Sequence, residues 1–316
     1  MKFLQERMME ILLIEAVLFT ALGSFVSFKP LKPTVPFAVF FMILQPMMVM
    51  NFKAFFEEWH RKAKLILLIL ILYSVAFPLL TWAFASAWFK VSVSLVAVGA
   101  VLTALAPVAM PAPTFVSALG GDVELSVASI IVTFLASLVV MPTWAYLILH
   151  KTVNVPIGML VKAIAEYIIL PLIVGQILRY VTLRSGSFEK VNKVLLDVSL
   201  LAMYYLIATI FGSASHAITS LGLAIAFFMV MVYVYYSIRF GMTYGIGKAL
   251  GLNWKELIAL VYAASVNGAL GMAVSLGAYG PEAAAGAVLA GPLGVLVIMI
   301  LLVKFFKKKS LGKGGG

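Results

Sequence analysis

The chain has no cysteine, only three histidines and few charged residues. Without cysteine it can form neither a disulfide nor a thiolate metal site. The histidines, at 60, 150 and 216, are too scattered to indicate a zinc site. Charged residues make up 11% of the 316 residues, less than half of the roughly 25% that is typical of soluble domains. This shortage of charge argues against a soluble globular domain.

Apolar residues fill the chain instead. They make up 64% of it, and the mean hydropathy is +1.12, so lipid must cover surface that a soluble core of this size could not hide. A membrane-spanning helix needs about 20 mostly apolar residues. Ten stretches qualify, which predicts an all-α polytopic membrane protein. The expected spans are 9–27, 34–51, 65–89, 92–118, 123–149, 156–181, 194–213, 217–239, 257–278 and 282–306.

Basic residues are unevenly distributed between the two ends of these spans. A net charge of +11 is compatible with nucleic-acid binding, but the charges fall in short loops between spans, where membrane topology explains them. We therefore expect no nucleic-acid partner. Most of the lysine and arginine residues, with Arg239 counted among the loop charges, fall on the side that carries both chain ends. This distribution predicts a multi-pass protein of the plasma or inner membrane with both termini in the cytoplasm.

The start of the chain superficially resembles a signal peptide. Lys2 and Arg7 precede an apolar run, but Glu10 and Glu15 interrupt that run and no clear cleavage site follows. We interpret the segment as a retained first span.

Two of the expected spans are interrupted. The first reads LAPVAMPAPT at 105–114, and the second reads AASVNGALG at 263–271. Lipid cannot satisfy the backbone groups that such breaks release, so both breaks must face protein or a water-filled cavity. A half-helix N-terminus carries about +0.5 and a C-terminus about −0.5 of an elementary charge, so a break can hold an anionic group or a cation. The structural alternative is a kinked helix that its neighbours satisfy.

The interrupted spans occupy corresponding positions in two halves of the chain. Each is the fourth of five spans, and each is followed by a turn with glycine and an acid, at 120–122 and 280–282. The next span in each half contains a proline, Pro142 or Pro292. This order predicts two inverted repeats, spans 1–5 at 1–151 and spans 6–10 at 152–309, followed by a disordered tail at 310–316.

A few polar residues in the spans are candidates for function. Those near the breaks are Thr114, Ser126, Thr133, Ser265 and Asn267, although serine and threonine in spans more often satisfy backbone or join helices. Buried acids are costly in a membrane, so Glu15 and Glu166 are candidate proton carriers. The alternative is that Glu15 is interfacial and that Glu166 pairs with Lys162, four residues earlier.

The sequence GDVELSV at 121–127, followed by Pro142 and preceded by Pro107, resembles a motif of the bile acid:sodium symporter family. The segment 263–270, with Gly291-Pro292-Leu293, resembles the related arsenite-efflux permeases. The resemblance implies a core domain of spans 3–5 and 8–10, a panel domain of spans 1, 2, 6 and 7, and broken spans 4 and 9 that cross. It also implies substrate binding between core and panel.

The resemblance further implies an ion site, but most of its ligand positions differ here. The family's serine–asparagine pair falls on Ala112 and Pro113, its span 9 glutamate on Tyr262 and its span 3 glutamine on Tyr73. Two of its polar positions persist, Ser126 and Asn267, which gives one candidate sodium site and no other metal site. The arsenite permeases' cysteine falls on Val108, which excludes a thiolate mechanism.

These observations predict a secondary active transporter that carries a small organic anion or amphipathic solute by alternating access, sodium-coupled by family default. The alternatives are a proton-coupled or uncoupled carrier, including arsenite-type efflux, and then a channel or a non-transporting membrane protein. No catalytic set is present, so we expect no enzyme, and no cofactor other than sodium. The partners expected are the solute and the lipid bilayer, and the oligomeric state stays open, with a monomer as one option. The expected binding residues are Tyr73, Pro111, Ala112, Pro113, Thr114, Ser126, Tyr262, Ser265 and Asn267.

Overall fold

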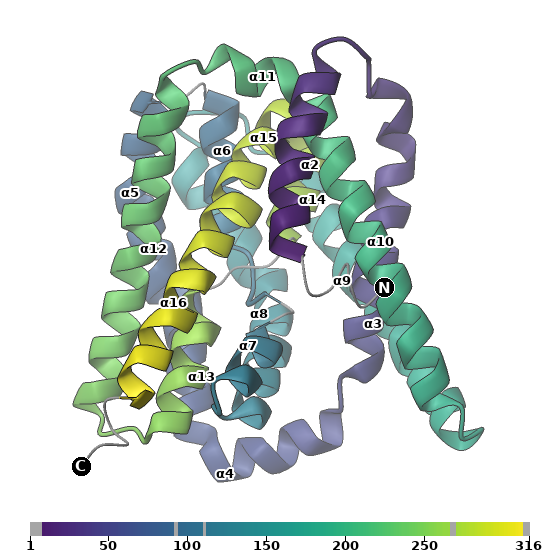
Figure 1. Ribbon diagram of the computed structural model, residues 1–316, viewed down its shortest axis with the longest axis vertical. Helices are drawn as coiled ribbons and strands as arrows, with labels where there is room; N and C mark the ends of the chain where they lie inside the picture. The colour runs from purple at the N-terminus through teal and green to yellow at the C-terminus, as the bar shows by residue number, and fades with distance from the viewer. Residues whose placement is uncertain (1–7, 92–93, 110–111, 266–269, 312–316) are drawn as a thin grey trace.

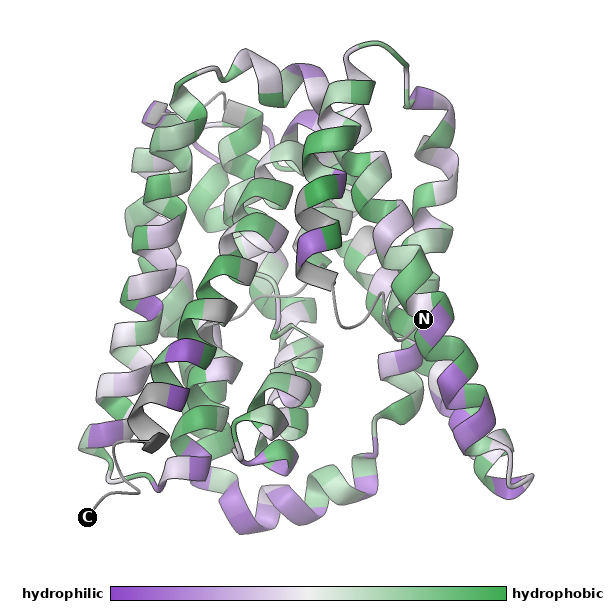
Figure 2. Ribbon diagram, viewed as in Figure 1, coloured by the Kyte–Doolittle hydropathy of each residue, from purple (hydrophilic) through white to green (hydrophobic). Residues whose placement is uncertain are grey.

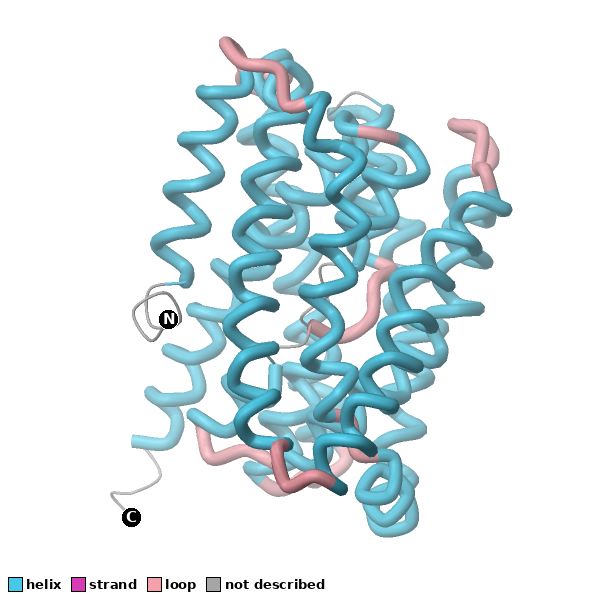
Figure 3. Tube along the Cα trace, turned by 90° about the vertical axis from the view of Figure 1, so that its right-hand side faces the viewer, coloured by secondary structure: helices cyan, strands magenta, loops and turns pink. Residues whose placement is uncertain are grey.

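The computed structural model describes residues 8–91, 94–109, 112–265 and 270–311, which form helices and loops and no β-strand. Loops lie at the two ends of the helices and, inside the molecule, about midway along them (Figure 3). The elements of the first half are α2 (Met8–Gly23), η1 (Lys29–Thr34), α3 (Val35–Val49), α4 (Phe52–Ile71), η2 (Leu72–Ala76), α5 (Phe77–Val91), α6 (Ser94–Ala104), α7 (Ala112–Ala118) and α8 (Val123–Leu149). Those of the second half are α9 (Ile157–Arg184), α10 (Phe188–Ser213), α11 (Ser215–Ser220), α12 (Ala224–Ala249), α13 (Trp254–Ser265), α14 (Leu270–Tyr279), α15 (Pro281–Val288), η3 (Leu289–Leu293) and α16 (Gly294–Leu311).

Many of these helices suit a bilayer. Six described helical stretches are long and apolar enough to cross a membrane: 52–90, 123–149, 157–184, 188–213, 224–249 and 281–307. Shorter apolar helices lie within α2, α3, α6 and α14. Hydrophilic residues gather at the lower end of the molecule in Figure 2, on α4 and on the lower turns of α10. The chain is therefore a multi-pass membrane protein, as the composition predicts.

The helices pack as two groups. In the first group α3 lies against α9 and α10, and α2 lies against α10. The second group contains α4 to α8 and α12 to α16, with α6, α14 and α15 at its centre (Figure 1). Contacts between the groups run from α9 to α8 and α14, and from α10 to α15. A cavity of about 10 Å³ with an apolar lining lies where α3, α8 and α9 meet, with Met47, Phe134 and Ile168 among its walls.

Glycines allow the central helices to touch backbone to backbone. A Cβ built on Gly99 of α6 would lie 1.7 Å from the Ala283 carbonyl oxygen of α15, and one on Gly286 of α15 would lie 1.7 Å from the Val96 carbonyl oxygen of α6. A Cβ on Gly271 of α14 would lie 2.5 Å from the Thr103 Cα of α6. Small residues at such contacts give van der Waals packing without a hydrophobic driving force, which is how helices associate within lipid.

Three expected boundaries are wrong. The segment between the expected spans 34–51 and 65–89 is helical from Phe52, where Asn51 caps α4 by accepting a hydrogen bond from the Ala54 amide at 3.3 Å. The connection between the expected spans 156–181 and 194–213 is shorter than expected, since α9 continues to Arg184 and α10 begins at Phe188. The eighth span, expected at 217–239, is the separate short helix α11 followed by α12, which continues ten residues beyond the expected end. Helix α16 runs to Leu311, and the rest of the expected tail, 312–316, lies outside the described residues.

Candidate functional site

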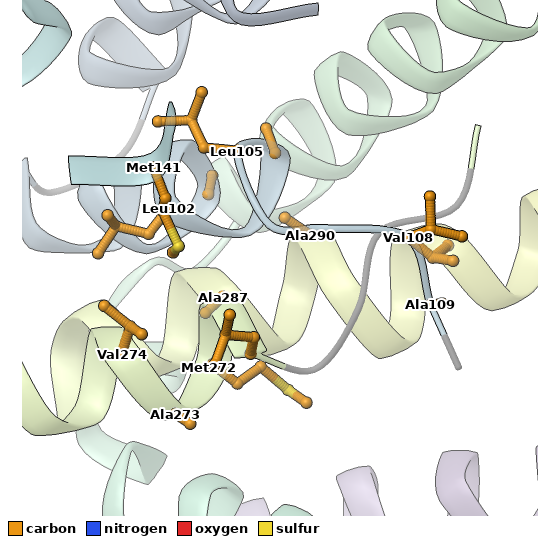
Figure 4. Close-up of a cluster of buried hydrophobic side chains, with 14 of the residues drawn as sticks. Leu102, Leu105, Val108, Ala109, Met141, Met272, Ala273, Val274, Ala287 and Ala290 are labelled. Atoms are coloured by element: carbon orange, nitrogen blue, oxygen red, sulfur yellow. The ribbon is translucent and has the colours of Figure 1, made fainter. Parts of the chain in front are cut away.

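The first broken segment is a buried stretch of non-helical backbone between α6 and α7. α6 ends at Ala104, and residues 105–109 are non-helical and buried throughout. The predicted interruption is confirmed here, and Pro107 explains it because proline cannot donate the hydrogen bond that a continuing helix needs. In Figure 4, Leu105 and Val108 belong to a cluster of buried apolar side chains that includes Met141 of α8 and Met272 of α14.

The second interruption expected from the sequence, at 263–271, lies only partly in the described residues. α13 is described up to Ser265 and α14 from Leu270, and residues 266–269 between them lie outside the described residues. At the first break α6 ends with its C-terminal carbonyls. The last four carbonyls of a helix lack partners within it, so this end needs donors from elsewhere.

Side chains of neighbouring helices satisfy the backbone of the first break. The Tyr73 hydroxyl donates to the Leu105 carbonyl at 3.0 Å, and the Thr133 hydroxyl accepts from the Val108 amide at 3.3 Å. Tyr73 lies in η2, a π-helical turn whose Ser74 carbonyl accepts from the Trp144 indole at 2.8 Å. These bonds meet the requirement that membrane-embedded backbone be satisfied by protein.

Arg239 contacts both breaks at once. Its Nε donates to the Ala264 carbonyl at 3.0 Å, and its Nη1 donates to the Ala104 carbonyl at 3.4 Å and to the Tyr235 hydroxyl at 3.3 Å. Ala104 is the last residue of α6, and Ala264 is the next-to-last residue of α13. The side chain is only 2% exposed. One guanidinium therefore bonds the C-terminal end of α6 and the last described turn of α13, which adjoins the second interruption expected from the sequence.

Aromatic rings enclose the same guanidinium. Its central carbon lies 4.1 Å from the centroid of the Phe77 ring, 5.5 Å from that of Tyr235 and 5.8 Å from that of Tyr236. The negative face of an aromatic ring attracts a cation, most strongly away from water.

Arg239 corrects an assignment made from the sequence. It was expected among the loop charges on the cytoplasmic side, but it lies inside α12, fully surrounded. The carbonyls and rings around it come from residues distant in sequence, so no local pattern reveals them. The sequence offers one signal that Arg239 lies inside a helix: mostly apolar residues continue after it, far enough to extend the helix by several turns.

Two of the expected binding residues carry buried hydroxyls that lack a partner among the described residues, Ser126 and Tyr262. Tyr262 is fully buried, and its ring stacks on that of Phe115 with centroids 6.0 Å apart. Burying an unpaired hydroxyl costs about 1–3 kcal/mol, so these two groups are suited to meet a ligand.

The structure places the other expected binding residues unevenly. Ala112 is buried, Pro113 is half-buried and Thr114 is exposed, all on α7. Pro111 and Asn267 lie outside the described residues, as does the side chain of Ser265. Tyr73 lies at the first break, through the bond to Leu105 given above.

The two expected proton carriers lie on other helices. Glu15 is half-buried on α2, which packs against α10 and α11, and its Oε2 has no partner among the described residues. Glu166 is exposed on α9 and pairs with Lys162 at 3.7 Å, as the alternative interpretation expects.

Charged side chains of the GDVELSV motif connect the start of α8 to α4. The Asp122 carboxylate accepts from the Leu125 amide at 3.0 Å as the helix cap, and it also pairs with Lys62. Lys62 bends α4, with φ −128° and ψ 29°, and contacts Glu58 at 3.1 Å. Carboxylate oxygens of Glu58, Asp122 and Glu124 lie within 4.8 Å of one another. Two cationic side chains already occupy the position that a metal ion would take. They are Lys62 and Arg61, whose guanidinium lies 3.5 Å from Glu124.

In a comparison with protein-family models, residues 36–221 match the model of the sodium bile acid symporter family. The matched segment runs from the start of α3 to the end of α11, so it includes the first break and the GDVELSV motif. The second break and Arg239 lie beyond it. A comparison with curated proteins returns no match.

Proposed function

Because the chain belongs to the sodium bile acid symporter family, a family of transporters, we propose that it is a secondary transporter of a small organic anion or amphipathic solute. The observation that carries the proposal is the end of α6 at a buried break in the middle of the molecule, joined through Arg239 to α13 beside the second expected interruption. Lipid cannot satisfy the backbone groups of a helix end in the membrane interior, whereas transporters use such ends to bind solutes and ions.

We propose the finer architecture as ten crossings in two inverted repeats, 1–151 and 152–309. Six long apolar helical stretches support this, together with the shorter helices in α2, α3, α6 and α14, the last two of which adjoin the breaks. In this arrangement the group of α2, α3, α9 and α10 is the panel, and the other group is the core. Both termini face the cytoplasm of a plasma or inner membrane.

Transport would proceed by movement of the panel group against the core group. The cavity of about 10 Å³ where α3, α8 and α9 meet holds no more than a water molecule, so an organic solute would bind there only after the groups separate. The two groups meet mainly through α9, where the Tyr167 hydroxyl lies 3.5 Å from the position of a Cβ on Gly277 of α14. An interface of limited extent is suited to sliding.

Binding would involve Ser126 and Tyr262, whose buried hydroxyls are unpaired among the described residues. Thr114, Ser265 and Asn267 are further proposed contacts. Sodium coupling is the family default, with Ser126 and Asn267 as its proposed ligands, and a proton-coupled or uncoupled carrier is the alternative.

Uptake into proteoliposomes tests the proposal. The purified protein is reconstituted and offered labelled organic anions and amphipathic solutes, with imposed sodium or proton gradients. We expect saturable uptake of at least one solute that excess unlabelled solute inhibits. Tyr262→Phe should lower that uptake without lowering the melting temperature, because its hydroxyl has no partner among the described residues and its burial is unfavourable. The matched control is Tyr180→Phe on the exposed face of α9.

Uptake that grows linearly with solute concentration and resists inhibition would contradict a carrier and favour a channel. A fall in melting temperature in Tyr262→Phe that matches its fall in uptake would remove the binding role of that residue.

A further inference from the structure

The position of Arg239 relative to the two breaks is the most unusual feature of the core. Its single guanidinium bonds one carbonyl from the end of α6 and one from the end of α13, at 3.4 and 3.0 Å. The C-terminal end of α6 carries about −0.5 of an elementary charge. Together with the Ala264 carbonyl, beside the second interruption expected from the sequence, it forms a place of negative potential deep in the protein, and Arg239 supplies the compensating positive charge.

Carbonyls at the ends of interrupted helices are also the groups with which secondary transporters coordinate a sodium ion. A free ion and a guanidinium therefore compete for the same oxygens. We propose that Arg239 is a tethered cation that takes the place of a dissociable monovalent cation between the two interrupted helices, so that neither stability nor transport needs sodium there. The inference rests on the proposed transport function for its consequence, but its test does not.

The chemistry of arginine fits this role. A guanidinium stays protonated at every physiological pH, so it supplies a constant charge and cannot itself carry protons. Its planar fork donates in several directions, which lets one side chain reach two helix ends and a hydroxyl at the same time. The Phe77 ring at 4.1 Å covers it on one side, which replaces the water that a free cation would retain.

A role in binding an anionic solute is the competing interpretation of a buried arginine. In this structure Arg239 is 2% exposed, and its donors already point at backbone carbonyls of the core group. A solute would have to displace those bonds to reach it. We therefore favour the tethered cation.

Thermal stability in different salts tests the proposal. The melting temperature of the detergent-purified protein is measured in sodium, potassium and choline chloride at equal ionic strength, for wild type and for Arg239→Ala. In a Ser126→Ala background, which removes a ligand of the proposed coupling site, we expect the protein that retains Arg239 to melt at one temperature in all three salts. Arg239→Ala should melt lower, and millimolar guanidinium or sodium should restore part of the loss in a saturable manner, because a ligand that binds only the folded state stabilises it.

The matched control is Arg179→Ala. Arg179 also donates to carbonyls at a helix end, Val49 at 3.2 Å and Met48 at 3.4 Å in α3, and also lies over a ring, that of Phe188 at 5.3 Å. It lies outside the breaks, so no cation should selectively restore its variant. A restoration of the same size in Arg179→Ala would show a general effect on helix ends and would overturn the proposal.

Two further outcomes would overturn it. One is a saturable, sodium-selective rise in the melting temperature of Ser126→Ala, because a dissociable cation would then bind between the helix ends despite Arg239. The other is an Arg239→Ala protein whose melting temperature responds to no cation. If Arg239→Ala does not fold, Arg239→Lys takes its place: it keeps the charge, so its melting temperature should be lower but equal in the three salts, and a sodium-selective rise would refute the idea. If no solute is taken up by the proteoliposomes, the proposed function is wrong. The salt dependence of the melting temperature would still test the role of Arg239.

Discussion

Substituting Gly286 by alanine should separate the two central helices. A Cβ there would lie 1.7 Å from the Val96 carbonyl oxygen, a backbone atom that no side-chain rotation can move. Because carbon–oxygen contacts below about 3 Å are strongly repulsive, α6 and α15 must move apart by more than about 1 Å. Such a shift removes close-packed contacts along the whole interface, and overpacking of this kind costs about 1–3 kcal/mol or more. We expect a loss at the upper end, about 3 kcal/mol.

The free energy of unfolding, measured by titration with a denaturing detergent, provides the assay. Gly245→Ala in α12 is the matched control, since a Cβ there meets nothing within 4 Å. Alanine is the better helix former by about 0.5–1 kcal/mol, so this control should be neutral or slightly stabilising.

Combining Gly286→Ala with Gly99→Ala sharpens the test. Both glycines serve the same interface, so the separation forced by the first substitution accommodates part of the second. We expect the double variant to lose less than the sum of the two single losses. Gly286→Ala as stable as Gly245→Ala, or two fully additive losses, would refute the backbone contact between α6 and α15.

Three other substitutions test the hydrogen bonds at the first break and the interactions of Asp122 between α4 and α8. The free energy of unfolding is the measurement for each. Thr133→Val keeps the volume but leaves a buried amide of the break without an acceptor, which should cost about 1–3 kcal/mol, whereas Thr182→Val in α9, whose hydroxyl bonds its own helix, should cost less. Tyr73→Phe removes the donor to a break carbonyl and should cost a similar 1–3 kcal/mol, and an unchanged stability would show that the carbonyl has another donor. Asp122→Ala should cost about 2–4 kcal/mol through loss of the α8 cap and of a shielded ion pair, while Asp122→Asn should retain the cap and lose less.

Local chemistry explains what the sequence predicts well. Pro107 ends α6 wherever the helix packs, so the interruption at 105–109 is predictable from one residue type. Likewise, runs of about 20 apolar residues predict membrane helices because the bilayer sets the length.

Tertiary partners explain what the sequence does not predict. As a charged residue, Arg239 marks the end of an expected span. α12 nevertheless continues past it, because carbonyls of α6 and α13 accept its hydrogen bonds and three aromatic rings cover its charge. Lys62 similarly falls in an expected loop, but the carboxylates of Glu58 and Asp122 hold it at a bend between helical segments. Which carbonyls and acids come near a given cation depends on helices far apart in the chain.

Movement of the panel group against the core group is the central claim, and a distance measurement between spin labels tests it most directly. The chain has no cysteine, so cysteines introduced for labelling react alone. Tyr180 in α9 and Leu250 after α12 are exposed and belong to different groups, and the C-terminal ends of α9 and α12 lie at the same end of the molecule (Figure 1). Tyr180 and the exposed Val194 of α10 form the control pair within one group. We predict that a transported solute shifts the distance between Tyr180 and Leu250 and leaves the control distance unchanged. A distance between the groups that stays single and constant during transport would contradict the account.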